Sequence, residues 1–292
     1  MIKEVNRKSM VIRPSGRSTD FISPSFGHGC LFECTYCYMK RHKPKNLDIA
    51  NDKSVTDILT EINSHVYFDT SVTKPNQTHE KYITYDISCN EDFALHAKHH
   101  DWKRIFTFFR DHELAMASLA TKYVNKKLLD FNPKGKVRIR FSLMPERLRQ
   151  ILEPNTSTIQ ERLQAVRLFQ EAGYDVHLNF SPVVYYDKWL QEYEELFLEV
   201  DDMAKRHHWD LGSPVKAEVI FLTHNYNKHN YNVVNNLPGE DLLWRPDIQE
   251  TKISEYGGEN IRYASIFKAQ WINEWRALHD RVIPWNTIRY IF

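Results

Sequence analysis

Two kinds of hydrophobic pattern follow one another along most of the chain. In residues 136–143, Val137, Ile139 and Phe141 alternate with polar residues, which is the period of a β-strand with one buried face. In residues 54–67, apolar residues instead recur every three or four positions behind Ser54, which we predict to cap a helix. The chain therefore contains both strands and amphipathic helices.

The same criteria predict six strands separated by helices. The strands are expected at residues 20–25, 82–88, 114–121, 136–143, 175–183 and 215–223. The helices are expected at 54–67, at 102–109, around Leu128, from Ile159 to Gly173 and at 187–206. Strands that alternate with helices predict an α/β fold with a parallel sheet and right-handed crossovers. If the sheet curls into a barrel, functional residues are expected at the C-terminal ends of its strands, which here carry Cys89, Lys122, Ser142, Ser181 and His224.

The pattern is weaker at both ends of the chain. Residues 1–20 are polar and basic and are expected to form a partly ordered arm, whereas residues 225–258 lack clear periodicity and are expected to be loops. The pattern of residues 252–265 predicts a hairpin that exposes Arg262 and Tyr263. The pattern of residues 267–282 predicts an amphipathic helix. A last strand is expected at 287–292. We therefore divide the chain into an arm (1–20), a catalytic domain (21–224) and a C-terminal extension with the hairpin (225–292).

Composition excludes some classes of protein. The 292 residues are 42% hydrophobic and 26% charged, and they contain no apolar run long enough to cross a membrane. Residues 1–17 carry several basic residues but no apolar segment of a secretion signal, so we expect a cytoplasmic protein. The formal net charge of +1 argues against a uniformly basic nucleic-acid binder, although local basic patches are compatible with it.

Three of the four cysteines lie within eight residues, as Cys30, Cys34 and Cys37. Thiolates at this spacing can turn toward one point, as metal or iron–sulfur ligation requires. Because structural zinc takes four closed ligands, a group of three favours an iron–sulfur cluster with one iron left open. Two alternatives stay open at this point. The cysteines could be structural, or they could bind zinc together with the distant Cys89.

The spacing CxxxCxxC, followed by an aromatic residue, resembles the signature of the radical S-adenosylmethionine enzymes. The resemblance implies that Cys30, Cys34 and Cys37 hold a 4Fe-4S cluster and that S-adenosylmethionine occupies the fourth iron. It also implies an incomplete six-stranded (βα)6 parallel barrel, here with a small C-terminal extension of a hairpin and a helix.

Other segments resemble one family within this group, the spore photoproduct lyases. They are residues 87–92 (ISCNED), Thr121-Lys122, residues 138–142 (RIRFS), 153–157 (EPNTS), 171–174 (EAGY) and the Tyr-Gly hairpin. They occur in order over most of the chain from about residue 25. The family repairs a DNA lesion in which two thymines are joined through a methyl carbon, so the resemblance implies a carbon–carbon lyase acting on damaged DNA.

The resemblance also implies roles for single residues. Cys89 matches the cysteine that gives a hydrogen atom to the thymine radical, and Tyr36 and Tyr38 match tyrosines that pass the radical back toward S-adenosylmethionine. Lys122 and Ser142, together with Tyr36, match positions near that cofactor. Arg262 and Tyr263 fall in the hairpin that supports the lesion in the family. An electron donor of the flavodoxin, ferredoxin or reductase type would be needed, and we expect a monomer.

One position departs from the family pattern. Glu91 stands where a serine is common, two residues after Cys89, and we expect it to add negative charge near the site that would receive DNA. The basic stretches 40–45 and 98–104 are candidates for phosphate contacts. The Glu91 difference and the weakly basic net charge keep a second hypothesis open, a radical enzyme with another substrate. A third is a non-catalytic zinc module.

Overall fold

The computed structural model describes residues 1–37, 47–68, 74–209, 215–253 and 258–292. It separates into two compact units, each built from discontinuous stretches of the chain. Unit 1 comprises Met1–Leu31, Lys43–Phe141 and Ala165–His177, and unit 2 comprises Phe32–His42, Ser142–Gln164 and Leu178–Phe292. Strands β8 (Val137–Leu143) and β9 (Asp175–Val183) begin in unit 1 and end in unit 2.

Parallel strands form the centre of unit 1. The order is β3 (Phe21–Ile22), β6 (Ile83–Asp86), β7 (Ala115–Thr121) and β8, with β2 (Arg13–Pro14) antiparallel at the edge of β3. A small second sheet pairs β5 (Leu47–Ala50) in parallel with β1 (Ile2–Val5) and antiparallel with β4 (Gly27–His28). Residues 1–20, which were predicted to form a partly ordered arm, thus contain two strands. Strand β5 was not predicted, because its four residues are too few to show a clear hydrophobic pattern.

Helices cover the strands of unit 1. They are α1 (Asp52–Phe68), α2 (Phe93–His96), α3 (Trp102–Asp111) and the 3-10 turns η2 (Ala97–His99) and η3 (Lys126–Asp130). In the core, the rings of Phe93 and Phe106 stack with centroids 5.7 Å apart, and each fully buried ring contributes about 2–3 kcal/mol. The prediction that Ser54 caps the first helix is wrong. Asn51 caps it, accepting the Ser54 N–H at 3.0 Å, because the helix begins two residues earlier.

Unit 2 continues the same type of architecture. Strand β10 (Lys216–Phe221) pairs in parallel with β9 on one side and with β14 (Thr287–Ile291) on the other. The predicted last strand is therefore confirmed. It is held there by the buried Glu218, which accepts from Tyr290 Oη at 2.8 Å and pairs with Arg289.

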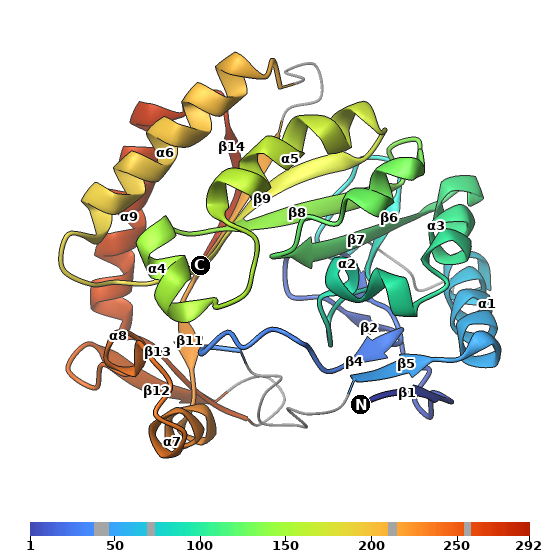
Figure 1. The fold of residues 1–292 in the computed structure, drawn as a ribbon, viewed down its shortest axis with the longest axis horizontal. Coiled ribbons are helices and arrows are strands. Elements are labelled where there is room, and N and C mark those ends of the chain that lie inside the picture. The colour runs from blue at the N-terminus through green and yellow to red at the C-terminus, as the bar shows by residue number, and fades with distance from the viewer. Residues whose placement is uncertain (38–46, 69–73, 210–214, 254–257) are drawn as a thin grey trace. The chain divides into compact units, whose positions relative to one another are not determined.

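Long helices cover the sheet of unit 2. Helices α6 (Trp189–Arg206) and α9 (Ser265–Val282) lie side by side (Figure 1). Trp275 of α9 packs with Phe180 of β9 and Phe197 of α6, at ring centroid distances of 5.3 and 5.0 Å. Two further helices are α4 (Glu146–Leu152) and α5 (Ile159–Glu171), and α5 ends in unit 1.

The C-terminal region confirms the hairpin but contradicts the predicted loops. Strands β12 (Gln249–Ile253) and β13 (Glu259–Tyr263) are antiparallel, and β11 (Thr223–His224) pairs with β13. Within the predicted loop, however, α7 (Tyr226–Val234) and α8 (Glu240–Leu243) form. Asn225 caps α7 by accepting the Lys228 N–H at 2.9 Å. The helix buries polar residues, Lys228 and Asn232, so it carries no apolar period that the sequence could have revealed.

Parallel strands connected through helices make this an α/β fold, as predicted. Among the described residues, no helix combines the length and apolar character needed to cross a membrane.

Candidate active site

The stretch after Cys30 is fixed to two helices of unit 2. The Thr35 N–H donates to the carbonyl of Leu152 at 2.9 Å, and Asn232 Nδ2 donates to the carbonyl of Thr35 at 2.9 Å. The Cys37 N–H bonds the carbonyl of Cys34 at 3.1 Å, which closes a tight turn between the two cysteines. Cys34 is buried and Cys37 is half-buried. The turn therefore holds these two thiols on a rigid backbone.

Tyr36 in the same turn reaches a buried ion pair. Its phenol donates to Glu153 Oε1, and Arg162 Nη2 donates to Glu153 Oε2 at 2.9 Å. The side chains of Glu153 and Arg162 are 0% exposed. Burial, followed by the charges of Glu153 and Cys34, raises the pKa of Tyr36 well above its ordinary value, so the phenol keeps its proton.

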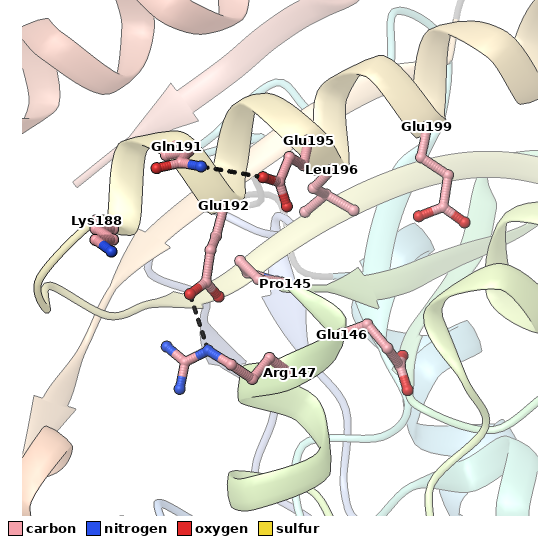
Figure 2. Close-up of a pocket in the computed structure, with 9 residues that line it drawn as sticks. All are labelled: Pro145, Glu146, Arg147, Lys188, Gln191, Glu192, Glu195, Leu196 and Glu199. Atoms are coloured by element: carbon pink, nitrogen blue, oxygen red, sulfur yellow. Dashed lines mark hydrogen bonds and ion pairs between the residues drawn. The ribbon is translucent and has the colours of Figure 1, made fainter.

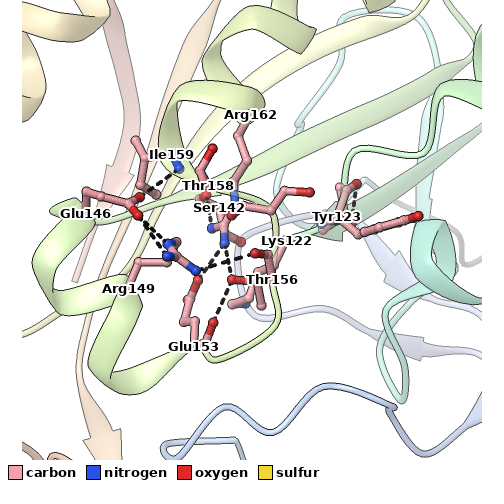
Figure 3. A network of polar contacts seen from close by, with 12 residues as sticks. Lys122, Tyr123, Ser142, Glu146, Arg149, Glu153, Thr156, Thr158, Ile159 and Arg162 are labelled. Carbon is pink, nitrogen blue, oxygen red and sulfur yellow. Dashed lines mark hydrogen bonds and ion pairs between the residues drawn. The ribbon is translucent and has the colours of Figure 1, made fainter.

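Arg162 joins Glu153 to the end of strand β8 (Figure 3). Its Nη1 donates to the carbonyl of Ser142 at 2.7 Å, and its Nε donates to the carbonyl of Ser157 at 3.0 Å. The hydroxyl of Ser142 accepts from Asn179 Nδ2 at 3.3 Å. The guanidinium group of Arg162 thus holds the backbone of Ser142 and also the Glu153 carboxylate that binds Tyr36. Ser142 and Tyr36 are two of the positions predicted to lie near the cofactor.

A separate group of predicted site residues follows strand β6 in unit 1. Cys89 is partly exposed there, and Arg13 Nη2 lies 3.7 Å from its Sγ. The next residue, Asn90, donates through Nδ2 to Ser25 Oγ and accepts the Gly29 N–H on its carbonyl at 3.0 Å. These contacts tie the Cys89 turn to the segment that leads into Cys30.

Asp92 fixes the position of Lys122. Its Oδ1 accepts from the Leu95 N–H at 3.1 Å, which caps α2, and from Thr121 Oγ1 at 2.7 Å. Its Oδ2 accepts the Lys122 N–H at 2.9 Å. One carboxylate therefore joins the turn after β6 to the end of β7, as expected for neighbouring parallel strands with functional C-terminal ends.

Glu91 is placed differently from the prediction, because its side chain is only 1% exposed. Its Oε2 lies 3.1 Å from His96 Nδ1 and 2.8 Å from His100 Nε2. Burial alone would raise the pKa of Glu91, but the two histidines outweigh it and the pKa is lowered. The expected negative charge at a DNA entrance is thus wrong: the carboxylate is internal and paired. This removes one of the two observations that favoured a different substrate, and the other, the net charge of only +1, is unaffected.

The two histidines had no role in the sequence analysis. His96 Nε2 accepts the backbone N–H of Leu31 at 3.3 Å, so its proton lies on Nδ1 and points to Glu91. The histidine thereby connects Glu91 to the residue after Cys30. A Cβ at Gly27 would overlap the Glu91 carboxyl group, so glycine is required where the segment passes over it.

The two predicted residues of the hairpin, Arg262 and Tyr263, differ in how far they are buried. Arg262 is half-buried and lies 3.5 Å from Glu250. Tyr263, expected to be exposed, is only 1% exposed; that prediction is wrong because its ring packs against Trp271 at a centroid distance of 5.1 Å. Its hydroxyl accepts the Tyr185 N–H at 2.8 Å. Tyr38 and the basic residues 40–45 lie outside the described residues.

The donor chemistry of the cysteines fits an iron–sulfur cluster. Cys30, Cys34, Cys37 and Cys89 are all thiols rather than halves of disulfides. Cys30 belongs to unit 1, and Cys34 and Cys37 belong to unit 2. The described residues contain no group of three or more His, Cys, Asp or Glu side chains gathered to hold a metal ion. Ligation by the three cysteines therefore stays a prediction from their spacing.

A cavity of about 360 Å³ in unit 2 is rich in acidic residues (Figure 2). Helix α6 contributes Glu192, Glu195 and Glu199, and α4 contributes Glu146. Two basic residues, Arg147 and Lys188, line it as well, and Arg147 Nε pairs with Glu192 at 2.8 Å. The excess of carboxylates disfavours phosphate groups at this cavity.

Comparison with known proteins identifies related chains. The family model described as "SPL: Spore photoproduct lyase" matches residues 4–292. Spore photoproduct lyase from Bacillus subtilis (strain 168) is 24% identical over 256 residues, covering 86% of this chain and 70% of that protein. The protein of the same name from Geobacillus sp. (strain Y412MC61) is 26% identical over 196 residues, covering 66% of this chain and 54% of that protein.

Solved structures agree on the fold. A spore photoproduct lyase variant with bound AdoMet and dinucleoside spore photoproduct matches all of this chain and 82% of its own, with a TM-score of 0.85 and 20% identity. A spore photoproduct lyase complexed with the dinucleoside lesion matches with a TM-score of 0.84 and 20% identity over the same shares. The predicted fold class, the incomplete parallel barrel of the radical S-adenosylmethionine enzymes, is confirmed. With its family model matched from residue 4 to residue 292, the chain belongs to the spore photoproduct lyase family, a family of radical S-adenosylmethionine lyases.

Proposed function

We propose that this protein repairs the spore photoproduct in DNA by breaking the methylene bridge between its two thymines. The observation that carries the proposal is the family match over residues 4–292, which includes the Cys89 turn. In unit 1, Asn90, Glu91 and Asp92 each anchor this turn to a different neighbouring segment. A hydrogen-donating thiol needs such a fixed position, because it must reach one carbon of the substrate.

Cys30, Cys34 and Cys37 would hold the 4Fe-4S cluster, with S-adenosylmethionine at the open iron. When bound, these groups supply a 5′-deoxyadenosyl radical that can take hydrogen from the lesion. Lys122 and Ser142 would contact the cofactor from the ends of β7 and β8. Two hydrogen bonds support these roles: Asp92 holds the backbone of Lys122, and Arg162 holds the backbone of Ser142.

Cys89 would give a hydrogen atom to the thymine radical that remains after the bridge breaks. Donation is downhill because an S–H bond is weaker than the C–H bond of a methyl group. Tyr36 and Tyr38 would then return the radical toward the cofactor. The support for Tyr36 is geometric, because the hydrogen bond from its phenol to the buried carboxylate of Glu153 fixes its position.

Arg262 is our candidate for a lesion contact in the hairpin. Tyr263 would act through the hairpin instead, since its buried ring and its bond to Tyr185 support the position of β13. Damaged DNA is the proposed partner, with a flavodoxin-, ferredoxin- or reductase-type protein as electron donor. We further propose a monomer in the cytoplasm.

The test is anaerobic turnover. The reconstituted enzyme is incubated with S-adenosylmethionine, a reductant and the dinucleotide lesion, and the products are separated by chromatography. We expect the two thymines to be restored. Cleavage of S-adenosylmethionine without loss of the lesion would reject the lyase but retain a radical enzyme.

Metal analysis separates the enzyme from a zinc module. We expect iron and sulfide in the anaerobically purified protein and loss of both in Cys34→Ala. One zinc per chain, without iron, would reject both enzyme hypotheses.

A further inference from the structure

A second cavity, of about 420 Å³, lies in unit 1. We call it the N-terminal cationic pocket. It is lined by residues of the first ninety positions, namely Arg7, Lys8, Ser9, Val11, Arg13, Ile22, Ser23, Pro24, Ser25, His28 and Asn90. Three of these are permanently basic and none is acidic. The pocket therefore has the opposite character from the cavity in unit 2, and its charge favours an anionic ligand.

Arg7 is built into the wall of this pocket. Its Nη2 donates to the carbonyls of Phe26 and Asp48 at 3.1 and 2.7 Å, and its backbone N–H donates to Ser54 Oγ at 2.8 Å. The guanidinium is held between segments that are far apart in the sequence. Because arginine stays protonated in proteins, Arg7 supplies a fixed positive charge, which the neighbouring carboxylates of Glu91 and Asp48 partly offset.

Lys8 and Arg13 add charge at the surface of the pocket. Both side chains are exposed, and neither forms an ion pair with a carboxylate among the described residues. Their positive charge is therefore available to a ligand. Ser9, Ser23 and His28 line the same cavity, and the Ser23 hydroxyl is already bonded to the carbonyls of Pro24 and Asp86 at 3.1 and 3.0 Å.

The pocket adjoins the proposed hydrogen donor. Arg13 lines it and also lies 3.7 Å from Cys89 Sγ, and Asn90, which lines it too, follows Cys89 in the chain. A DNA strand that presents its lesion to Cys89 would therefore bring its backbone close to these cations. Phosphodiester groups are what arginine and lysine bind most commonly in such contacts.

We propose that the N-terminal cationic pocket binds a backbone phosphate of the DNA strand that carries the lesion. This inference rests on the proposed function, because it needs a DNA substrate at Cys89. The pocket would position the strand without reading its sequence. It differs from the basic stretches 40–45 and 98–104 that the sequence suggested.

The first test measures DNA binding without turnover. Fluorescence anisotropy with a labelled single-stranded oligothymidylate would follow affinity across salt concentrations for wild type, Lys8→Gln and Arg13→Gln. Each lost phosphate contact should weaken binding and reduce the slope of log K against log salt by about 0.7. Lys53→Gln, an exposed lysine on α1 outside the pocket, is the matched control and should match wild type.

The second test uses the substrate itself. Lys8→Gln should raise KM for a lesion within an oligonucleotide but leave turnover of a dinucleoside lesion unchanged, because the dinucleoside has no phosphate. Thermal melting checks that each variant is folded. Wild-type affinity and salt slope in both pocket variants would overturn the proposal, whether or not the protein is a lyase. Binding of millimolar inorganic phosphate in the pocket without any change in oligonucleotide binding would also overturn it, in favour of a site for free anions.

Failure of the proposed function has a different signature. If wild type binds oligonucleotide through Lys8 and Arg13 but does not convert the lesion, the pocket stands as a DNA phosphate site and the lyase is rejected.

Discussion

The phenol of Tyr36 donates its hydrogen bond to the carboxylate of Glu153, 117 positions later in the chain. Glu153 is at the same time the partner of Arg162, and neither side chain of that ion pair reaches solvent. The proposed radical-relay tyrosine is therefore positioned by a buried charge pair. The same pair holds Ser142 through the second Nη of Arg162.

Glu153→Gln should destabilise the protein strongly. Removing one partner leaves the guanidinium of Arg162 buried without its counter-charge, which typically costs about 3–5 kcal/mol. Urea denaturation, with the slope of the transition checked for constancy, measures the loss. Glu146→Gln is the control, since Glu146 pairs with Arg149 while 38% of its side chain is exposed, and the expected loss is at most about 1 kcal/mol. Equal losses in the two variants would contradict the importance of the buried pair.

Cys89→Ala should leave stability and cleavage of S-adenosylmethionine unchanged but alter the products. The thiol is partly exposed and small, so its loss should change the free energy of unfolding by less than about 1 kcal/mol. Without the hydrogen donor, the thymine radical should form adducts or damaged products in place of clean thymine, while S-adenosylmethionine is still cleaved. Product analysis by chromatography decides this. Cys89→Ser is a matched variant that keeps a polar group of similar size and should fail in the same way, because an O–H bond is too strong to donate. Clean thymine from either variant would remove Cys89 from the mechanism.

The main strands were predictable because their local pattern is strong. Strand β8 alternates apolar with polar residues, and its polar members became ion pairs, such as Arg140 with Asp86 at 2.8 Å. The cysteine spacing and the Cys89 turn were equally visible. By contrast, α7 buries polar residues and α8 has only four residues, so no hydrophobic period marked either helix.

The supports of the site could not be predicted from the sequence. In the sequence, Glu153 belongs to a polar segment and Arg162 to a predicted helix. No local pattern indicates that their side chains are buried and meet Tyr36. The same holds for His96 and His100, whose contacts with Glu91 depend on the tertiary structure. Tyr263 was misjudged for a related reason, since a hairpin usually exposes every second residue but here α9 covers that face through Trp271.

Gly27 and Glu91 should be energetically coupled. Alanine at position 27 forces its methyl group into the Glu91 carboxyl group, and such overpacking typically costs about 1–3 kcal/mol. The smaller side chain of Glu91→Ser should relieve that clash, so the double variant should lose less stability than the two single losses added together. A double-mutant cycle of urea denaturation measures this coupling, expected at about 0.5–3 kcal/mol.

Gly16→Ala is the control for that cycle. No atom lies within 4 Å of its Cβ position, so the change should stay within about 0.5 kcal/mol. Strict additivity of Gly27→Ala and Glu91→Ser would show that the two positions do not meet in the folded protein.

Asp175 should govern part of the acid sensitivity of unit 1. Its Oδ2 lies 2.6 Å from Arg138 Nε and its Oδ1 3.3 Å from His177 Nε2. Burial would raise the pKa of Asp175, but the two basic neighbours outweigh it and hold the pKa far below the ordinary value. A folded-state pKa below the unfolded one gives stability that is present above the unfolded pKa of about 3.9 and is lost as the pH falls toward the folded value.

Asp175→Asn removes this contribution, so the variant should be less stable than wild type by about 2–3 kcal/mol at pH 7. The difference should shrink as the pH falls below about 4, because only the wild-type carboxylate can take up the proton that weakens its ion pairs. Urea denaturation at a series of pH values from 7 downward measures how the free energy of unfolding of wild type and of Asp175→Asn depends on pH. Asp111→Asn is the surface control. Asp111 pairs with Arg110 at the surface, where 57% of the Asp111 side chain is exposed, so its loss should leave the pH dependence close to that of wild type. A constant difference between wild type and Asp175→Asn at every pH would show that the aspartate acts through packing rather than through its charge.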